Sequence, residues 1–177
     1  MRLFVGLDLP WDLKQRLLLL AGGVPGARWV PPKNLHVSLR FIGEVPPVQA
    51  EEIDHALAAV RAPRFSLNLA GVGLFEKSSR GGVLWVGVER NPALDHLQAK
   101  IETALQRAGL ERERRRFTPH VTLARLDNAP AANVAAFVQS KNLFRAAPVP
   151  IEYFFLFSSL LHREGSVYTP EVEYALT

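Results

Sequence analysis

The chain of 177 residues contains no cysteine, and this absence removes several kinds of chemistry at once. Disulfide bonds, thiolate nucleophiles and cysteine-based zinc or iron–sulfur sites all need sulfur atoms that the sequence does not supply. A metal site would have to use histidine and carboxylate ligands, and the five histidines show no His-x-x-x-His or similar spacing. We therefore predict that the protein uses neither a metal ion nor a cofactor.

The sequence also lacks a long apolar segment. The longest leucine run, Leu17 to Leu20, is far shorter than the roughly 20 residues that span a bilayer. The N-terminus opens on a strand-like pattern without a signal-peptide layout, so we expect a soluble, cytoplasmic protein with no membrane partner. Hydrophobic residues make up 48% of the chain, enough for a packed core, and the net charge of +4 weakly favours an anionic partner such as a nucleic acid.

Apolar residues alternate in some segments and follow helical spacing in others, which predicts an α+β protein. Proline stands at the start of each helical pattern, where its missing N–H is tolerated. Strands are predicted over residues 2–9, 35–42, 65–74, 83–88, 121–126, 151–161 and 166–176. Helices are predicted to begin after Pro10, after Pro46, at Asn91 and at Pro130.

The order of these elements repeats along the chain. Strand starts at residues 2 and 83 lie 81 positions apart, helix-opening prolines at 10 and 92 lie 82 apart, and both the histidine motifs and the second helices lie 84 apart. These offsets favour an internal duplication of a strand–helix–strand–helix–strand unit. The alternative is coincidence within an ordinary α+β domain. We predict one bilobal domain over residues 1–177, with pseudo-repeats of about 1–80 and 81–177.

One short motif occurs in both pseudo-repeats. Residues 36–39 read His-Val-Ser-Leu and residues 120–123 read His-Val-Thr-Leu. Because side chains alternate between the two faces of a strand, His36 and Ser38 share one face, and His120 and Thr122 repeat this arrangement. If a local two-fold relates the repeats, the two strands can bring both histidines to one groove.

Two imidazoles and two hydroxyls around a groove suit phosphoryl transfer at a phosphodiester. A neutral histidine can take a proton from attacking water, and a protonated one can give a proton to the leaving ribose oxygen. A lone histidine on a strand is more often a packed or exposed residue than a catalyst. The recurrence of the motif in matched positions favours catalysis by His36 and His120.

These motifs make the sequence resemble the two-histidine phosphoesterases, specifically the RNA 2',3'-cyclic phosphodiesterases historically labelled 2'-5' RNA ligases. Further resemblance lies in the segments RLFVGLDLP, RWVPPKNLHVSLRFIGEV, VLWVGVE, FTPHVTLAR and YTP. The resemblance implies a bilobal α+β fold with antiparallel sheets around a central groove. It also implies metal-independent hydrolysis of an RNA 2',3'-cyclic phosphate end to a 2'-phosphate, with 2'-5' ligase activity as an accompanying reaction in vitro.

The resemblance extends to individual positions. It implies that His36 is the acid on the ribose 3'-oxygen and His120 the base on water, although the residues alone leave the reverse open. It also implies that Arg125 binds phosphate and that Phe41 stacks on the nucleobase. The first motif carries Ser38 where the family more often has threonine, and both residues supply a hydroxyl.

Strict alternation conflicts with the role of Arg125. This residue is five positions after His120, so a regular strand points it to the opposite face. Either the strand ends or bulges near Ala124, or the long side chain curls round. Arg40 has the same parity as His36 and Ser38, and we keep it as a second candidate for phosphate binding.

Two alternatives to this function remain open. One is a phosphodiesterase for other 2'-linked or small cyclic nucleotides. The other is a non-catalytic module that binds RNA ends. We expect the protein to act as a monomer.

Overall fold

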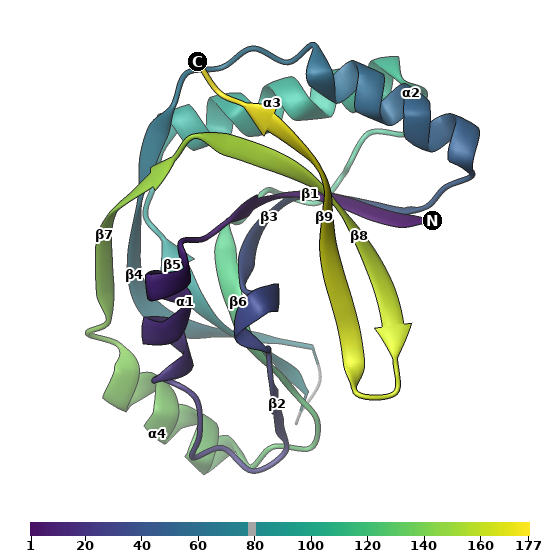
Figure 1. Cartoon of the computed structure of the whole chain (residues 1–177). Coiled ribbons are helices and arrows are strands. Elements are labelled where there is room, and N and C mark those ends of the chain that lie inside the picture. The colour runs from purple at the N-terminus through teal and green to yellow at the C-terminus, as the bar shows by residue number, and fades with distance from the viewer. Residues whose placement is uncertain (78–80) are drawn as a thin grey trace.

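A computed structural model describes residues 1–77 and 81–177, and it confirms the α+β class (Figure 1). The predicted boundary between the pseudo-repeats falls beside residues 78–80, outside the described part of the chain. The strands are β1 (Arg2–Asp8), β2 (Ala27–Trp29), β3 (His36–Glu44), β4 (Phe65–Glu76), β5 (Gly82–Val88), β6 (His120–Leu126), β7 (Arg145–Ile151), β8 (Tyr153–His162) and β9 (Gly165–Ala175). The helices are α1 (Trp11–Leu18), the 3-10 helix η1 (Pro32–Asn34), α2 (Pro47–Ala58), α3 (Pro92–Arg107) and α4 (Ala131–Lys141).

The strands form one sheet with β3 and β6 at its centre. Its order is β7-β4-β5-β6-β3-β1-β8-β9, with β2 on the side of β6, and neighbouring strands run antiparallel. The last strand of the first half, β4, pairs with β5 and β7 of the second half, while β8 of the second half pairs with β1. Each half of the sequence therefore contributes strands to the other half's side of the sheet.

The helix α3 shows why the sequence folds as it does locally. Asn91 caps the helix, because its side-chain oxygen accepts a hydrogen bond of 3.1 Å from the backbone N–H of Leu94. Pro92 follows in the first turn, and Gly109, with a φ of 97°, comes just after the helix. The buried face is an apolar stripe of Leu94, Leu97, Ile101 and Leu105. Helices α2 and α3 pack side by side over one end of the molecule (Figure 1).

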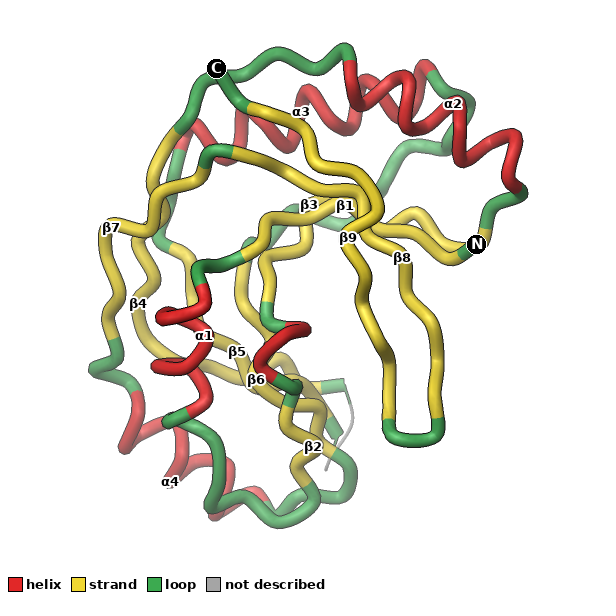
Figure 2. Tube along the Cα trace, in the orientation of Figure 1, coloured by secondary structure: helices red, strands yellow, loops and turns green. Residues whose placement is uncertain are grey.

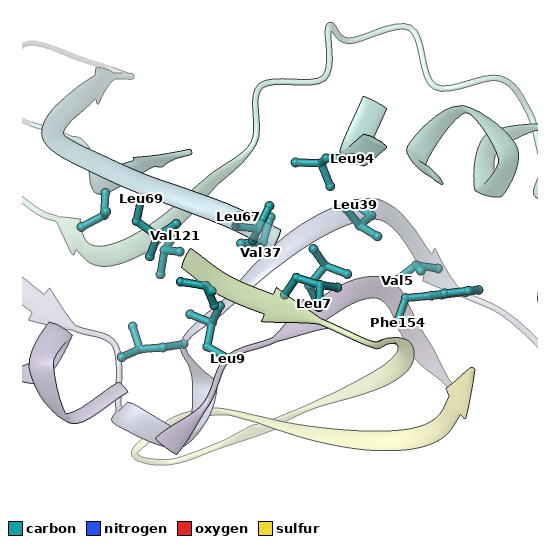
Figure 3. Close-up of a cluster of buried hydrophobic side chains, with 14 of the residues drawn as sticks. Val5, Leu7, Leu9, Val37, Leu39, Leu67, Leu69, Leu94, Val121 and Phe154 are labelled. Atoms are coloured by element: carbon teal, nitrogen blue, oxygen red, sulfur yellow. The ribbon is translucent and has the colours of Figure 1, made fainter. Parts of the chain in front are cut away.

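The hydrophobic core lies behind the central strands. Val37, Leu39 and Val121 lie in a cluster with Leu67 and Leu94 (Figure 3). These residues are buried while the histidines beside them are only partly buried, as alternation predicts for β3 and β6. None of the helices in residues 1–77 and 81–177 has the length and apolar character needed to cross a membrane.

Some elements of the fold were not predicted from the sequence. Strand β2 has three residues, too few to show a period, and β7 contains Pro148 and Pro150, which are atypical of strands. Both lie away from the centre of the sheet: β7 is an edge strand, and β2 pairs only with the outer part of β6. The predicted closing pair of strands is present as β8 and β9, which form a long hairpin that extends beyond the rest of the sheet (Figure 2).

A buried ion pair joins the centre of the sheet to α3 and to the loop before β6. The Arg40 guanidinium, with its side chain 7% exposed, lies 2.7 Å from the Glu102 carboxylate. It also donates to the backbone carbonyls of Phe41 and Glu111. Glu102 in turn accepts a hydrogen bond of 2.9 Å from the backbone N–H of Glu113. The pair thereby fixes the loop that leads to His120.

We expect Arg40→Ala to lower the free energy of unfolding by about 3–5 kcal/mol, because it leaves the Glu102 carboxylate without its buried partner. The matched control is Arg64→Ala, whose pair with Glu152 spans 3.9 Å and is more than half exposed. That control should change stability by about 1 kcal/mol or less. Urea denaturation of both variants measures the difference, and equal losses would contradict the structural role of Arg40.

Candidate active site

The two motif histidines are held in the same way. His36 and His120 are the first residues of β3 and β6. Nδ1 of His36 lies 2.6 Å from the carbonyl oxygen of Asn34, and Nδ1 of His120 lies 2.8 Å from that of Thr118. A carbonyl oxygen can only accept, so in each ring Nδ1 carries a proton. The neutral form of each histidine therefore keeps its lone pair on Nε2, where it can act as a base.

The strands β3 and β6 pair through Val37 and Val121. In an antiparallel ladder, the residues on either side of such a pair also lie opposite each other. His36 is thus placed across from Thr122, and Ser38 across from His120. Each histidine has a hydroxyl residue of the other motif in front of it, and Ser38 Oγ also lies 2.9 Å from Nε2 of His36.

Both motif strands carry a β-bulge at the last residue of the motif. Val5 pairs with Arg40 but Gly6 pairs with Ser38, which leaves Leu39 as an additional residue in β3. Likewise Leu84 pairs with Ala124 and Trp85 with Thr122, which leaves Leu123 as an additional residue in β6. A bulge inserts one residue and so reverses the alternation beyond it.

The bulges decide between the two candidate arginines. Arg125 is exposed on β6, whereas Ala124 before it is buried. In β3 the same shift buries Arg40 and exposes Phe41. The expectation that Arg40 faces the phosphate was therefore wrong, because it assumed an unbroken alternation. Arg40 is engaged with Glu102, and Arg125 and Phe41 occupy equivalent positions in the two motifs.

A cavity of about 860 Å³ lies over these strands. Five of the predicted site residues line it: His36, Ser38, Phe41, Thr122 and Arg125. His120 is not among the lining residues described, but its neighbours in the site are: Thr122 two residues along β6 and Ser38 across the strand pair. The structure thus brings together the histidines, both hydroxyls, one arginine and one exposed aromatic ring.

The two histidines have different surroundings. His36 lies among Phe4, Phe157 and Tyr168, with ring centroids 4.9, 5.9 and 5.3 Å away. This burial lowers the pKa of His36 below its ordinary value of 6.5, and the hydrogen bond to the Asn34 carbonyl opposes the effect only in part. Within residues 1–77 and 81–177, the one aromatic ring beside His120 is that of Phe75, which lies edge-on with the ring centroids 5.0 Å apart.

Two residues at the site were not predicted from the sequence alone. Asn34 and Tyr168 both line the cavity, the first through its position before His36 and the second from β9. Tyr168 belongs to the segment YTP, which the resemblance included without giving it a role. Within the described ranges, no group of three or more histidine, aspartate or glutamate side chains is arranged to hold a metal ion.

Comparisons with known proteins decide the family. A family model described as the "2'-5' RNA ligase superfamily" matches residues 21–160. The chain belongs to this superfamily. The comparisons thus confirm the resemblance predicted from the two histidine motifs.

Relatives of this superfamily match most of the chain. A protein of Aeropyrum pernix named RNA 2',3'-cyclic phosphodiesterase is 37% identical over 150 residues, covering 82% of this chain and 84% of its own length. An Escherichia coli protein of the same name is 30% identical, covering 99% and 97%. The crystal structure of E. coli LigT complexed with 3'-AMP has a TM-score of 0.79 at 28% identity and covers 99% and 98%.

We expect Arg125→Ala to lower kcat/KM for a cyclic phosphate substrate. The loss should correspond to about 1.5–3 kcal/mol of transition-state stabilisation, because a charged hydrogen-bond donor is lost from the cavity. Arg125→Lys should recover only part of the rate, since lysine cannot make a planar two-point contact. Steady-state kinetics measure both.

The control for these variants is Arg90→Ala, at an exposed arginine that does not line the cavity. It should leave kcat/KM unchanged. If Arg125→Ala behaves like Arg90→Ala, the prediction that Arg125 binds the substrate phosphate is wrong.

Proposed function

We propose that this protein hydrolyses RNA 2',3'-cyclic phosphate ends to 2'-phosphomonoesters, with His36 and His120 as the acid–base pair. The observation that carries the proposal is the matched geometry of the two rings. Each Nδ1 is held by a backbone carbonyl, and the paired strands present both rings beside hydroxyl residues. The names of the relatives support the choice of substrate.

The reaction needs one proton removed and one delivered. Water attacks phosphorus, forming a new P–O bond while the base takes its proton. The bond from phosphorus to the ribose 3'-oxygen breaks, and the acid protonates that oxygen. The 2'-oxygen bond is kept, so the product is a 2'-phosphate. Each proton transfer by a positioned histidine contributes roughly 10²–10⁴-fold to the rate.

The surrounding residues suit the phosphate and the base. Ser38, Thr122 and Arg125 line the cavity with donors that can bind the non-bridging oxygens of a phosphate anion. The ring of Phe41 is 45% exposed and can stack on a nucleobase. The Arg2 guanidinium lies over the same ring, 5.5 Å from its centroid.

The same reaction with a different nucleophile in place of water is a ligation. If a 5'-hydroxyl of a second RNA replaces water, attack on the cyclic phosphate produces a 2'-5' linkage and releases the same 3'-oxygen. The name of the superfamily favours this second reaction. A cytoplasmic location and a monomeric state remain predictions from the sequence.

The decisive experiment follows an RNA oligonucleotide that ends in a 2',3'-cyclic phosphate. We expect conversion to the 2'-phosphate, identified by its resistance to an enzyme that removes only 3'-phosphates. His36→Ala and His120→Ala should each lower kcat at least 10²-fold without unfolding. His55→Ala, at an exposed histidine on α2, is the matched control and should leave the rate unchanged.

Other outcomes of this experiment would identify the alternatives. Tight binding of the RNA end without turnover would favour a non-catalytic module. Turnover of a 2'-5' dinucleotide or a small cyclic nucleotide, but not of the RNA end, would favour a different phosphodiesterase. We expect activity to survive excess chelator, and its loss and recovery with one divalent ion would contradict the metal-independent mechanism.

The pH dependence of the reaction should be bell-shaped, because one histidine must be neutral and the other protonated. The rate then falls in acid as the base gains a proton, and falls in alkali as the acid loses one. Burial lowers the pKa of His36. The part of the pH profile of kcat/KM that reports the titration of His36 in the free enzyme should therefore lie below pH 6.5. A bound phosphate anion favours the protonated ring and should move that limb upward in kcat.

The variants tell which limb belongs to His36. If His36 is the acid, as the resemblance implies, His36→Ala should abolish the alkaline fall and keep a residual rate. Both limbs report apparent values of an interacting pair, so the comparison is made between variants and not between absolute values. An alkaline fall that persists in His36→Ala and disappears in His120→Ala would exchange the two roles.

A further inference from the structure

Asn34 is a buried polar residue at the end of η1, with 4% of its surface exposed. Its backbone carbonyl accepts the hydrogen bond from Nδ1 of His36, at 2.6 Å. Its side chain reaches in another direction, to β9. There the amide Nδ2 donates to the carbonyl of Ser166 at 2.7 Å, and Oδ1 accepts from the N–H of Tyr168 at 3.4 Å. A single residue therefore contacts both the ring of His36 and the β8–β9 hairpin.

The part of the hairpin that Asn34 holds lies beyond the strand pairing with the rest of the sheet, and the ring of Tyr168 also packs against Phe4 and His36. Pairing between β1 and β8 ends at Ser158, so the described residues beyond it, up to His162, pair only with β9. An isolated two-stranded hairpin is marginally stable in water. The amide of Asn34 supplies a tie between this distal part and the rest of the molecule.

The distal hairpin is also a wall of the cavity. Ser159 pairs with Tyr168, and Leu161 with Ser166, and all four residues line the cavity. Leu161 is 80% exposed, and the Tyr168 ring meets His36 edge-on at 89°. A substrate in the cavity would thus contact the hairpin and the catalytic ring at the same time.

We propose that Asn34 is a positioning residue that couples the β8–β9 hairpin to the orientation of His36. The hairpin holds the amide, the amide fixes the backbone of Asn34, and the backbone carbonyl keeps the proton of His36 on Nδ1. Nε2 is thereby directed at the cavity, where proton transfer takes place. The proposal deepens the function proposed above and rests on it, because it assumes that His36 transfers a proton.

The second motif offers a comparison. His120 is held by the carbonyl of Thr118, which is exposed in the loop before β6. His36 is instead held by a buried residue whose side chain makes two hydrogen bonds of its own. The coupling is therefore a property of the first histidine, and its loss should affect His36 and leave His120 unchanged.

The test replaces Asn34 with leucine, which has a similar size and no hydrogen bonds. The chain contains a matched control in Asn91, whose side chain makes the same two kinds of bond: it donates to the Ser66 carbonyl at 2.7 Å and accepts from the Leu94 N–H at 3.1 Å. Asn91 does not line the cavity. Asn91→Leu therefore measures the general effect of losing such bonds.

The first readout is independent of turnover. The ¹⁵N chemical shifts of the His36 ring report which nitrogen carries the proton. We expect the Nδ1–H form in the wild type and in Asn91→Leu, and a mixture of tautomers in Asn34→Leu. The signals of His120 should not change in either variant. If Asn34→Leu does not fold, Asn34→Asp keeps the acceptor for Tyr168 and serves in its place, with a smaller shift in the same direction.

The second readout separates positioning from stability. Both leucine variants should lose thermal stability, but only Asn34→Leu should lower kcat, by at least tenfold with KM changed less than threefold. An unchanged His36 tautomer and a kcat within twofold of wild type would overturn the proposal, whatever the loss in Tm. If the wild type fails to cleave any cyclic phosphate, the proposed function falls, and the ring spectra still decide the coupling.

Discussion

The contact between β3 and β6 at Val37 and Val121 determines where every residue of the candidate site lies. Both valines are buried completely, so the register of this pair is fixed by the core. A slip of β3 by one residue would turn Val37 to the cavity and His36 to the core, at a high cost in free energy, and a slip of β6 would do the same to Val121 and His120. The buried side of each motif thus positions its polar side: the pairing of Val37 with Val121 brings His36 and His120 to neighbouring positions.

The bulge at the last residue of each motif gives β3 and β6 the same backbone path, but the side chains that follow it differ. At the fifth position after the histidine, β3 presents the ring of Phe41 and β6 presents the guanidinium of Arg125. An aromatic ring suits a base, and a guanidinium suits a phosphate. The two strands therefore present different side chains on a similar backbone, as a ligand with a base at one end and a phosphate at the other would require. The same asymmetry extends to the histidines, of which only His36 lies among three aromatic rings.

The sequence predicted the α+β class, the central strands and the placement of both histidines on one face of them, because alternation and helical spacing are local patterns. It did not predict the position of Arg40, since a bulge leaves no mark in the order of residues and is decided by the pairing with β1. It also missed Asn34, whose partners on β9 lie more than 130 positions away. No local pattern reports a contact over that distance. Arg125 lines the cavity, and the phosphate-binding role that the resemblance implies for it stays a prediction, while unbroken alternation favoured Arg40, which is buried.

The exchange of strands between the two halves has a consequence for how the chain folds during its synthesis. Strand β4 of the first half pairs with β7 near the end of the chain, and β8 of the second half pairs with β1. Neither half can complete its side of the sheet until nearly all of the chain has been synthesised. Contacts of such large sequence separation slow folding. A ribosome-bound fragment that already contains His36 would therefore have no catalytic competence, and the enzyme would become active only as a whole.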